Sequence, residues 1–298
     1  MESASAVFRP EVSSVFPEAE VHAVPTSDGT EVRLTRYRMG TKGPVVLAPG
    51  YGNAARAFAL DTVPKSFVQY LGEHDYDVWL LDYRASPDLP SSHTQFTVDD
   101  IALRDWPAAV DTIRRETGQD EIQALGIKGL NTDYDPRSLP DKAIEAVMKV
   151  LPFRHVYDDP VARRIYFIYG DVFDYENIDE DTMRSSVPSF FGNGNITFFE
   201  HISLMIRAGE ARNARGEDVY VSNLDAYKLP INFMTGEHNR MFVPQGLQRT
   251  YDTLRKGNGP EQYRHTVVQD YAHLDLWLGT NAERDVFPTA LAELERHN

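Results

Sequence analysis

Two polar segments contain side chains that can hold or transfer a proton. The first, Thr235-Gly-Glu-His-Asn239, follows an apolar run and offers Glu237 and Asn239 as groups that could orient a histidine. The second, Tyr271-Ala-His273-Leu-Asp275, contains His273, a candidate general base. A single loop histidine is more often a surface or packing residue, so the order of segments along the chain must support the assignment. The sequence leaves open whether Glu237 or Asn239 orients His273.

A third segment, Ala48-Pro-Gly-Tyr-Gly52, comes earlier in the chain and follows another apolar run. Backbone amides in such a turn, at Gly50 and Tyr51, can face a developing oxyanion. An ordinary turn between a strand and a helix has the same composition, so the glycine pair alone does not decide between the two interpretations. An oxyanion turn, then an acid or amide, then a histidine is nevertheless an order used in acyl-transfer enzymes.

No residue at the expected place can act as a nucleophile. Between the turn and the histidine loops the chain reads Glu121-Ile-Gln-Ala-Leu-Gly126-Ile-Lys-Gly129, without serine and without a G-x-S-x-G turn. The chain has no cysteine, which excludes thiolate catalysis, disulfides and Cys-ligated metals. Serines elsewhere lack the glycine-flanked elbow that activates a hydroxyl; the candidates are Ser91, Ser92, Ser185, Ser186, Ser189 and Ser203.

Two other chemistries are weakly supported. A metal site could use His238, Asp270, His273 and Asp275, but His-x-Asp spacing is common and no further histidine clusters nearby, so we expect no metal. Gly192-Asn-Gly194 does not follow a buried strand and lacks the third glycine of a dinucleotide-binding turn. We therefore expect no bound cofactor.

The elements that would position these loops begin with alternating strands and helices. Residues 31–37 alternate apolar and polar side chains, as a half-exposed strand does. Residues 44–49 and 77–82 are continuous apolar runs, typical of parallel strands covered on both faces. Residues 58–71 predict the helix between them, ending at Gly72. The pattern favours a mostly parallel, doubly wound sheet.

The next helix has a clear start and stop. Thr97 and Asp100 form a capping box, and Gly118 is the expected C-terminal cap. Pro107 should kink this helix or begin a second one, because proline removes a donor and clashes with the preceding turn. A strand over residues 122–125 follows.

Residues 127–229 carry few strand signals and predict helices, most clearly at 141–151 and 196–208. The latter should end at Gly209 and bury one apolar face, namely Phe198, Phe199, Ile202, Met205 and Ile206. We interpret 127–229 as a helical lid in a single domain whose core is 1–126 and 230–298. Further core elements are expected as a strand at 230–235, a helix from 244, a strand at 263–268 and a helix at 282–296.

Composition restricts the partners and the location. The net charge of -15 argues against nucleic acid or an anionic membrane as a partner, because phosphates are bound by clustered Lys and Arg. The first ten residues do not resemble a signal peptide, and the longest apolar stretches are too short to span a bilayer. We expect a cytoplasmic protein without a transmembrane segment.

Several longer segments carry a more specific resemblance. They are Val46-Leu-Ala-Pro-Gly-Tyr-Gly52, Asp77-Val-Trp-Leu-Leu-Asp-Tyr-Arg-Ala-Ser86, Asp105-Trp-Pro-Ala-Ala-Val110, Phe199-Glu-His-Ile-Ser203, Gly216-Glu-Asp-Val-Tyr220 and Arg284-Asp-Val-Phe-Pro288. Together they resemble the α/β-hydrolases that are fused to, or encoded beside, cholesterol-oxidase-like (GMC-type) flavoproteins. The similarity extends over nearly the whole chain.

This resemblance implies an α/β-hydrolase fold with a helical lid and an activity of esterase or lipase type. It implies His273 as the catalytic histidine, Gly50 and Tyr51 as the oxyanion turn, and residues 237–239 as the acid-position loop. In these relatives the strand matching 122–125 enters a Gly-His-Cys or Gly-His-Ser elbow, then a helix and another strand. This chain passes directly to Gly126-Ile-Lys-Gly-Leu130, so we expect one strand–helix unit, at least roughly 30 residues, to be missing.

Three hypotheses follow. The protein is a hydrolase impaired or inactivated by the absent nucleophile elbow, or a non-catalytic domain, or an internally deleted form of an active enzyme. A non-catalytic domain would bind an apolar ester, a sterol-like molecule or a flavoprotein oxidase, with Phe190, Phe191, Phe198 and Phe199 as candidate pocket residues. Loss of a strand would leave a central strand without a neighbour unless the strand at 230–235 moved beside it.

Overall fold

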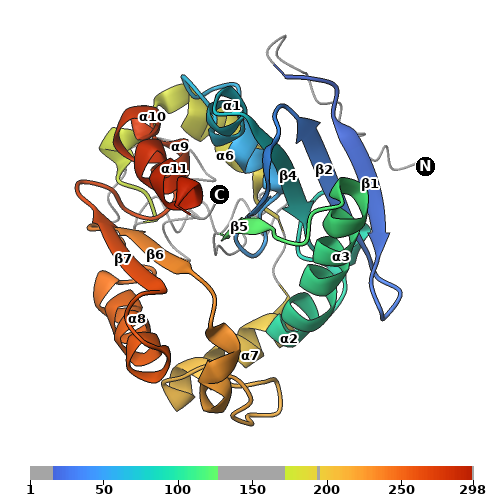
Figure 1. The fold of residues 1–298 in the computed structure, drawn as a ribbon, viewed down its shortest axis with the longest axis vertical. Helices are drawn as coiled ribbons and strands as arrows, with labels where there is room; N and C mark the ends of the chain where they lie inside the picture. The colour runs from blue at the N-terminus through green and yellow to red at the C-terminus, as the bar shows by residue number, and fades with distance from the viewer. Residues whose placement is uncertain (1–15, 127–171, 193–194, 297–298) are drawn as a thin grey trace, which may run out of the picture.

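The computed structural model of the protein describes residues 16–126, 172–192 and 195–296. Its strands are β1 (Glu20–Pro25), β2 (Glu31–Arg38), β3 (Lys42–Ala48), β4 (Tyr76–Asp82), β5 (Gln123–Gly126), β6 (Ile231–Gly236) and β7 (Tyr263–Val268). They form a five-stranded sheet in the order β1-β2-β4-β3-β5 and a two-stranded sheet, β6-β7 (Figure 1). The pairs β1–β2 and β2–β4 are antiparallel, and the pairs β3–β4, β3–β5 and β6–β7 are parallel. The predicted mostly parallel α/β architecture is confirmed.

Helices and single turns connect and cover these strands. The α-helices are α1 (Phe67–Glu73), α2 (Val98–Asp100), α3 (Trp106–Thr117), α6 (Val187–Phe190), α7 (Ile196–Ala208), α8 (Pro244–Asn258), α9 (Asp275–Leu278), α10 (Ala282–Asp285) and α11 (Phe287–Glu295). Short 3-10 turns lie at Ala55–Ala59, Pro90–His93, Tyr175–Asn177 and Val221–Tyr227, and π-helical turns at Ile101–Asp105 and Thr182–Ser186. None of the described helices is long and apolar enough to cross a membrane.

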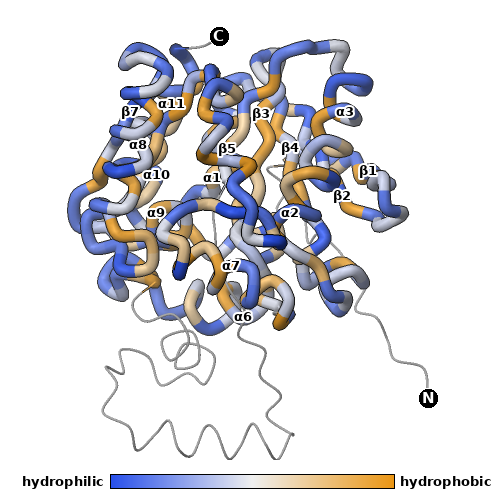
Figure 2. The backbone as a smooth tube through the Cα atoms, turned by 90° about the horizontal axis from the view of Figure 1, so that it is seen from below, coloured by the Kyte–Doolittle hydropathy of each residue, from blue (hydrophilic) through white to orange (hydrophobic). Residues whose placement is uncertain are grey.

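Both faces of the five-stranded sheet are buried at β3 and β4, as the continuous apolar runs predict. Alternate side chains of β3 and β4 point to opposite faces. Leu47 and Leu80 pack with α1, α9 and α11, whereas Val46 and Trp79 pack with Ile113 of α3. In Figure 2 the most hydrophobic backbone runs along β3 and β4. The core therefore lies on either side of these two strands, and the turn that begins at Pro49 follows directly after β3.

Two of the predicted helices are broken where prolines occur. The helix expected over 58–71 is α-helical only from Phe67, because Pro64 interrupts the pattern and Ser66 forms a new capping box with Gln69. The closing helix expected over 282–296 divides at Val286 into α10 and α11, with Pro288 in the first turn of α11. Pro107 likewise begins α3 after the π-helical turn, as predicted.

The capping box of Thr97 with Asp100 and the left-handed caps at Gly118 and Gly209 are confirmed. The helix predicted at 196–208 has the expected bounds, but its buried face is narrower than expected. Ile206 is 73% exposed, and the fully buried side chains of α7 are Phe198 and His201. The helix expected at 141–151 and Asn193 and Gly194 of the glycine pair lie outside the described residues.

The two sheets do not share a strand pair within residues 16–126, 172–192 and 195–296. There β5 pairs with β3 on one side, and β6 pairs with β7 rather than with β5. The strand at 231–236 therefore has not moved beside β5 to replace a missing neighbour. In Figure 1, β5 and the β6–β7 pair lie on opposite sides of the central region.

Candidate active site

Asn239 and His273 meet beyond the carboxyl ends of β6 and β7. Because these two strands are parallel, the loops that follow them leave the sheet at the same edge. Backbone bonds join the loops: Glu237 N–H donates to the Val268 carbonyl at 2.8 Å, and His238 N–H donates to the Tyr271 carbonyl at 2.8 Å. Asn239 Nδ2 then lies 3.2 Å from His273 Nδ1. The structure thus brings together two of the residues that the sequence singled out.

Gly236 permits this close approach. A Cβ atom at this position would overlap the backbone carbonyl oxygens of Tyr271 and Ala272. Backbone atoms cannot rotate away as a flexible side chain can, so any larger residue would separate the two loops. The glycine that ends β6 is therefore a condition for the Asn239–His273 contact, a requirement invisible in the sequence.

The histidine loop is held from several sides. The backbone N–H groups of His273 and Leu274 both donate to the Val172 carbonyl, at 3.3 and 3.0 Å. The Phe242 ring lies over the imidazole, with 5.1 Å between ring centroids. Both site side chains are buried, with 4% of Asn239 and 8% of His273 exposed. Fixed groups with little water contact suit a preorganised site.

Asp275 fastens the same loop from within. Its carboxylate accepts hydrogen bonds from the Ala272 N–H at 3.0 Å and from Asn177 Nδ2 at 2.8 Å, and the residue is fully buried. Burial raises the pKa of Asp275 to about 6, and these hydrogen bonds only partly offset that effect. Asp275 therefore positions the loop and does not reach the surface.

Asp275 should make stability depend on pH. Because its pKa is about 6 in the folded state and 3.8 in the reference state, folding favours the protonated carboxyl. That stabilisation is complete below pH 3.8 and is lost as the pH rises through about 6. The shift corresponds to about 3 kcal/mol. The Asp275→Asn variant should therefore gain up to about 3 kcal/mol in unfolding free energy, relative to wild type, between about pH 4 and pH 7.

Urea unfolding of both proteins at the two pH values measures this difference. A fixed loss from altered hydrogen bonds would shift the variant equally at both pH values and cancels in the comparison. A difference between the two proteins that stays constant from about pH 4 to pH 7 would show that Asp275 is not the titrating group.

Glu237 lies apart from this contact, on the surface. Its carboxylate is 3.8 Å from His238 Nε2, while His238 Nδ1 is 2.8 Å from Asp174. The hydrogen bond to Asp174 raises the pKa of His238. Between the two residues that the sequence left open, the structure places Asn239 at hydrogen-bond distance from His273.

The four residues weighed as a metal site do not gather in one place. In the described residues, the group with ligand atoms within 4.8 Å of one another is Glu237, His238 and Asp270, all exposed. His273 faces Asn239, and Asp275 is buried against Ala272 and Asn177. The metal alternative as formulated from the sequence is therefore wrong in its ligand set.

The glycine turn after β3 is fastened to residues 190–192. Asn53 N–H donates to the Gly50 carbonyl at 3.1 Å, and Gly192 N–H donates to the Gly52 carbonyl at 2.7 Å. The Tyr51 side chain has a role that the sequence did not suggest. Its hydroxyl accepts from the Asn195 N–H at 2.6 Å, and its ring stacks on Phe198 at 3.7 Å. Tyr51 thereby anchors the start of α7.

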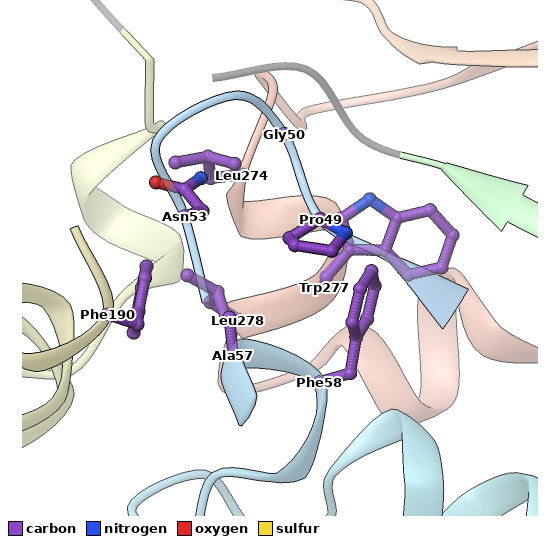
Figure 3. A pocket seen from close by; sticks show the side chains of 9 residues that line it. All are labelled: Pro49, Gly50, Asn53, Ala57, Phe58, Phe190, Leu274, Trp277 and Leu278. Atoms are coloured by element: carbon purple, nitrogen blue, oxygen red, sulfur yellow. The ribbon is translucent and has the colours of Figure 1, made fainter. Parts of the chain in front are cut away.

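A small apolar pocket connects this turn with the histidine loop (Figure 3). It is lined by Pro49, Gly50, Asn53, Ala57, Phe58, Phe190, Leu274, Trp277 and Leu278. Its volume of about 10 Å³ accommodates about one water molecule. Phe190 lines this pocket, whereas Phe198 packs on Tyr51 and Phe191 on Phe190. The turn after β3 and Leu274, the residue after His273, therefore line the same pocket.

Most of the serines considered as substitute nucleophiles use their hydroxyls in hydrogen bonds that hold the local structure. Ser92 Oγ donates to the Leu89 carbonyl, Ser185 Oγ to Asp181, and Ser189 Oγ to the Ser186 carbonyl. Ser186 Oγ pairs with Thr62, Ser203 Oγ accepts from Arg207, and Ser91 Oγ is buried without a partner. None of these described contacts joins a serine hydroxyl to a histidine.

Comparison with known proteins agrees with this architecture. No family model matches the chain. Lipase 1 of Drosophila melanogaster is 29% identical over 37% of the chain and 27% of its own length. The poly(3-hydroxyalkanoate) polymerase subunit PhaC of Haloferax mediterranei is 23% identical over 87% of the chain and 60% of its own length. Gastric triacylglycerol lipase of Bos taurus is 29% identical over 36% of the chain and 32% of its length.

Solved structures give the fold. An esterase of Pyrococcus furiosus superposes with a TM-score of 0.53 at 14% identity, covering 94% of this chain and 93% of that one. A lipase in its open form superposes with a TM-score of 0.55 at 12% identity, covering 93% and 99%. The chain therefore has the α/β-hydrolase fold, and its resemblance is to esterases and lipases. It spans less than two thirds of the length of each of the three curated relatives.

Proposed function

We propose that this protein is an ester-directed member of the esterase and lipase type that lacks its nucleophile, binds acyl esters and hydrolyses them slowly through water. The observation that carries the proposal is the buried Asn239–His273 contact at the carboxyl ends of β6 and β7. Ligands of open parallel sheets bind at such ends. The Gly50 turn lines the pocket that is also lined by Leu274, the residue after His273, so the turn and the histidine loop border the same space.

The similar proteins support the choice of an ester. Three are named as lipases and one as an esterase, and PhaC is named for a polymer of hydroxyalkanoate units. We also propose the division that the sequence predicts, with a core at 1–126 and 230–298 and a helical lid at 127–229. We also infer that one strand–helix unit with the nucleophile elbow is missing after β5, because the sequence after Leu125 holds no elbow.

A non-catalytic binding domain is the second candidate, favoured by the absence of a nucleophile and the apolar lining of the pocket. Drug-sized ligands occupy pockets of roughly 300–1,000 Å³, whereas the described pocket holds about one water molecule, so a sterol does not fit it as it stands. A flavoprotein oxidase as the partner remains a proposal that rests on the sequence resemblance alone, as does the cytoplasmic location on composition.

The pre-steady-state course of ester hydrolysis tests the proposed function. With p-nitrophenyl butyrate we expect saturable turnover and a progress curve that is linear from the first turnover, because no acyl-enzyme forms without a nucleophile. Heat-unfolded protein is the control for turnover by unstructured histidines. A burst near one product per chain would reveal a nucleophile and contradict the proposal. No turnover above the control by a chain with native circular dichroism would favour the binding domain.

A further inference from the structure

The orientation of the Asn239 amide is fixed by groups other than His273. Its Oδ1 accepts hydrogen bonds from the backbone N–H groups of Met241 and Phe242, at 3.1 and 2.9 Å. Its Nδ2 donates to Thr235 Oγ1 at 3.2 Å. Turning the amide by 180° would point its NH2 group at two N–H donors and leave them buried and unsatisfied, at a cost of about 1–3 kcal/mol each. The amide nitrogen therefore faces the imidazole.

An amide nitrogen can only donate, so His273 Nδ1 must accept. A neutral imidazole has one protonated nitrogen, and an accepting Nδ1 places the proton on Nε2. A carboxylate in the same place would have the opposite effect: it would accept from Nδ1–H and leave the Nε2 lone pair free to take a proton. In a serine protease triad, exchange of the aspartate for asparagine gives the wrong tautomer and lowers kcat by about 10⁴-fold.

We propose that Asn239 holds His273 as the Nε2–H tautomer, so that the neutral ring donates a hydrogen bond to a ligand carbonyl and is not the base that activates a hydroxyl or water. A neutral histidine can polarise a carbonyl in this way. The ligand class that such a group recognises is a neutral acceptor oxygen, here the ester carbonyl. This last step rests on the proposed function; the tautomer itself does not.

The surroundings preserve this arrangement. Thr235 is 1% exposed and Asn239 4%, so water has little access to replace the bonds of the amide. The Phe242 ring, tilted at 52° to the imidazole, restricts its rotation. Asn239 thus acts as a positioning residue, and its effect is on the protonation of its neighbour and not on the ester directly.

The tautomer can be observed directly. In ¹⁵N-labelled protein at a pH where the imidazole is neutral, long-range ¹H–¹⁵N correlation should show His273 with a protonated Nε2 and an unprotonated Nδ1. Asn239→Asp should reverse the pattern, because its carboxylate accepts from Nδ1. Asn239→Ala should give neither tautomer a strong preference. A wild-type spectrum with Nδ1 protonated would overturn the inference, whatever the activity.

Kinetics supply the second readout. Asn239→Asp should raise p-nitrophenyl butyrate turnover at least about tenfold, because Nε2 can then act as a general base on water. The gain should follow deprotonation of the imidazole with pH and vanish in Asn239→Asp combined with His273→Ala. A reversed tautomer without that gain would refute the donor role. An Nε2–H spectrum in a protein without ester turnover would support the tautomer and refute the proposed function.

Discussion

Replacing His273 with alanine is expected to lower ester hydrolysis by the folded protein at least about 100-fold, close to the uncatalysed rate. The reason is that His273 contributes a preorganised hydrogen-bond donor, and removing such a donor costs about 10²–10³-fold in other acyl-transfer enzymes. The substitution should affect kcat more than KM, because an imidazole donor binds the developing oxyanion more strongly than the ground-state carbonyl. Steady-state kinetics with p-nitrophenyl butyrate measure both constants.

His93→Ala is the matched control, because His93 is an exposed histidine in the 3-10 turn after β4, outside the candidate site. It should hydrolyse the ester at the wild-type rate, which would exclude hydrolysis by surface histidines. Equal turnover by wild type and by His273→Ala would remove His273 from the mechanism. The binding-domain hypothesis would then be the better account.

Much of the scaffold was predictable because it follows from one-dimensional patterns. The strands at 44–49 and 77–82 were recognisable since both of their faces are buried, which leaves no polar alternation. The bounds of α7 were predictable from its cap residues, with Asn195 accepting from the Phe198 N–H and Gly209 in the left-handed conformation. Local hydrogen bonds of this kind do not depend on distant parts of the chain.

Other elements depended on tertiary packing that the sequence does not express. The apolar spacing of α7 predicted burial of Ile206, but no described element covers that side chain. The helix over 58–71 was too long because apolar residues such as Leu60 and Val63 pack in a second hydrophobic cluster with Phe173 and Phe190 and need no helix for that. Apolar spacing indicates which side chains are buried, but packing against neighbouring elements determines whether the segment is helical.

The candidate site was predictable in its composition and not in its geometry. Asn239 and Glu237 lie two residues apart, and only the turn after β6 decides which side chain faces inward. That turn depends on the Asn239 N–H donating to the Gly236 carbonyl at 3.2 Å and on Oδ1 accepting from Met241 and Phe242. A sequence shows that an amide is present but not which of its atoms meets the imidazole.

The charged residues within the resemblance segments have a structural explanation. Asp105, fully buried, accepts from Arg84 Nη2 at 2.7 Å, from Arg84 Nε at 3.0 Å and from the Arg84 backbone N–H at 3.1 Å. Asp82 similarly accepts from the Ala55 N–H and from Ser86 Oγ, both at 2.7 Å. These bonds fasten the loops at the carboxyl end of the sheet, so Asp105 and Asp82 support the site and do not form it.

Asp105→Ala should therefore lower the unfolding free energy by about 3–5 kcal/mol, the cost of removing one partner from a buried ion pair. Asp28, which is also bonded to Arg84 at 2.9 Å, is too exposed to compensate fully. Glu295→Ala is the matched control: Glu295 pairs with Lys42 at the same 2.7 Å, but the two side chains are 38% and 39% exposed. Removing that surface pair should cost at most about 1 kcal/mol. Urea unfolding separates the cases, and equal losses would show that burial does not determine what the Arg84–Asp105 pair contributes.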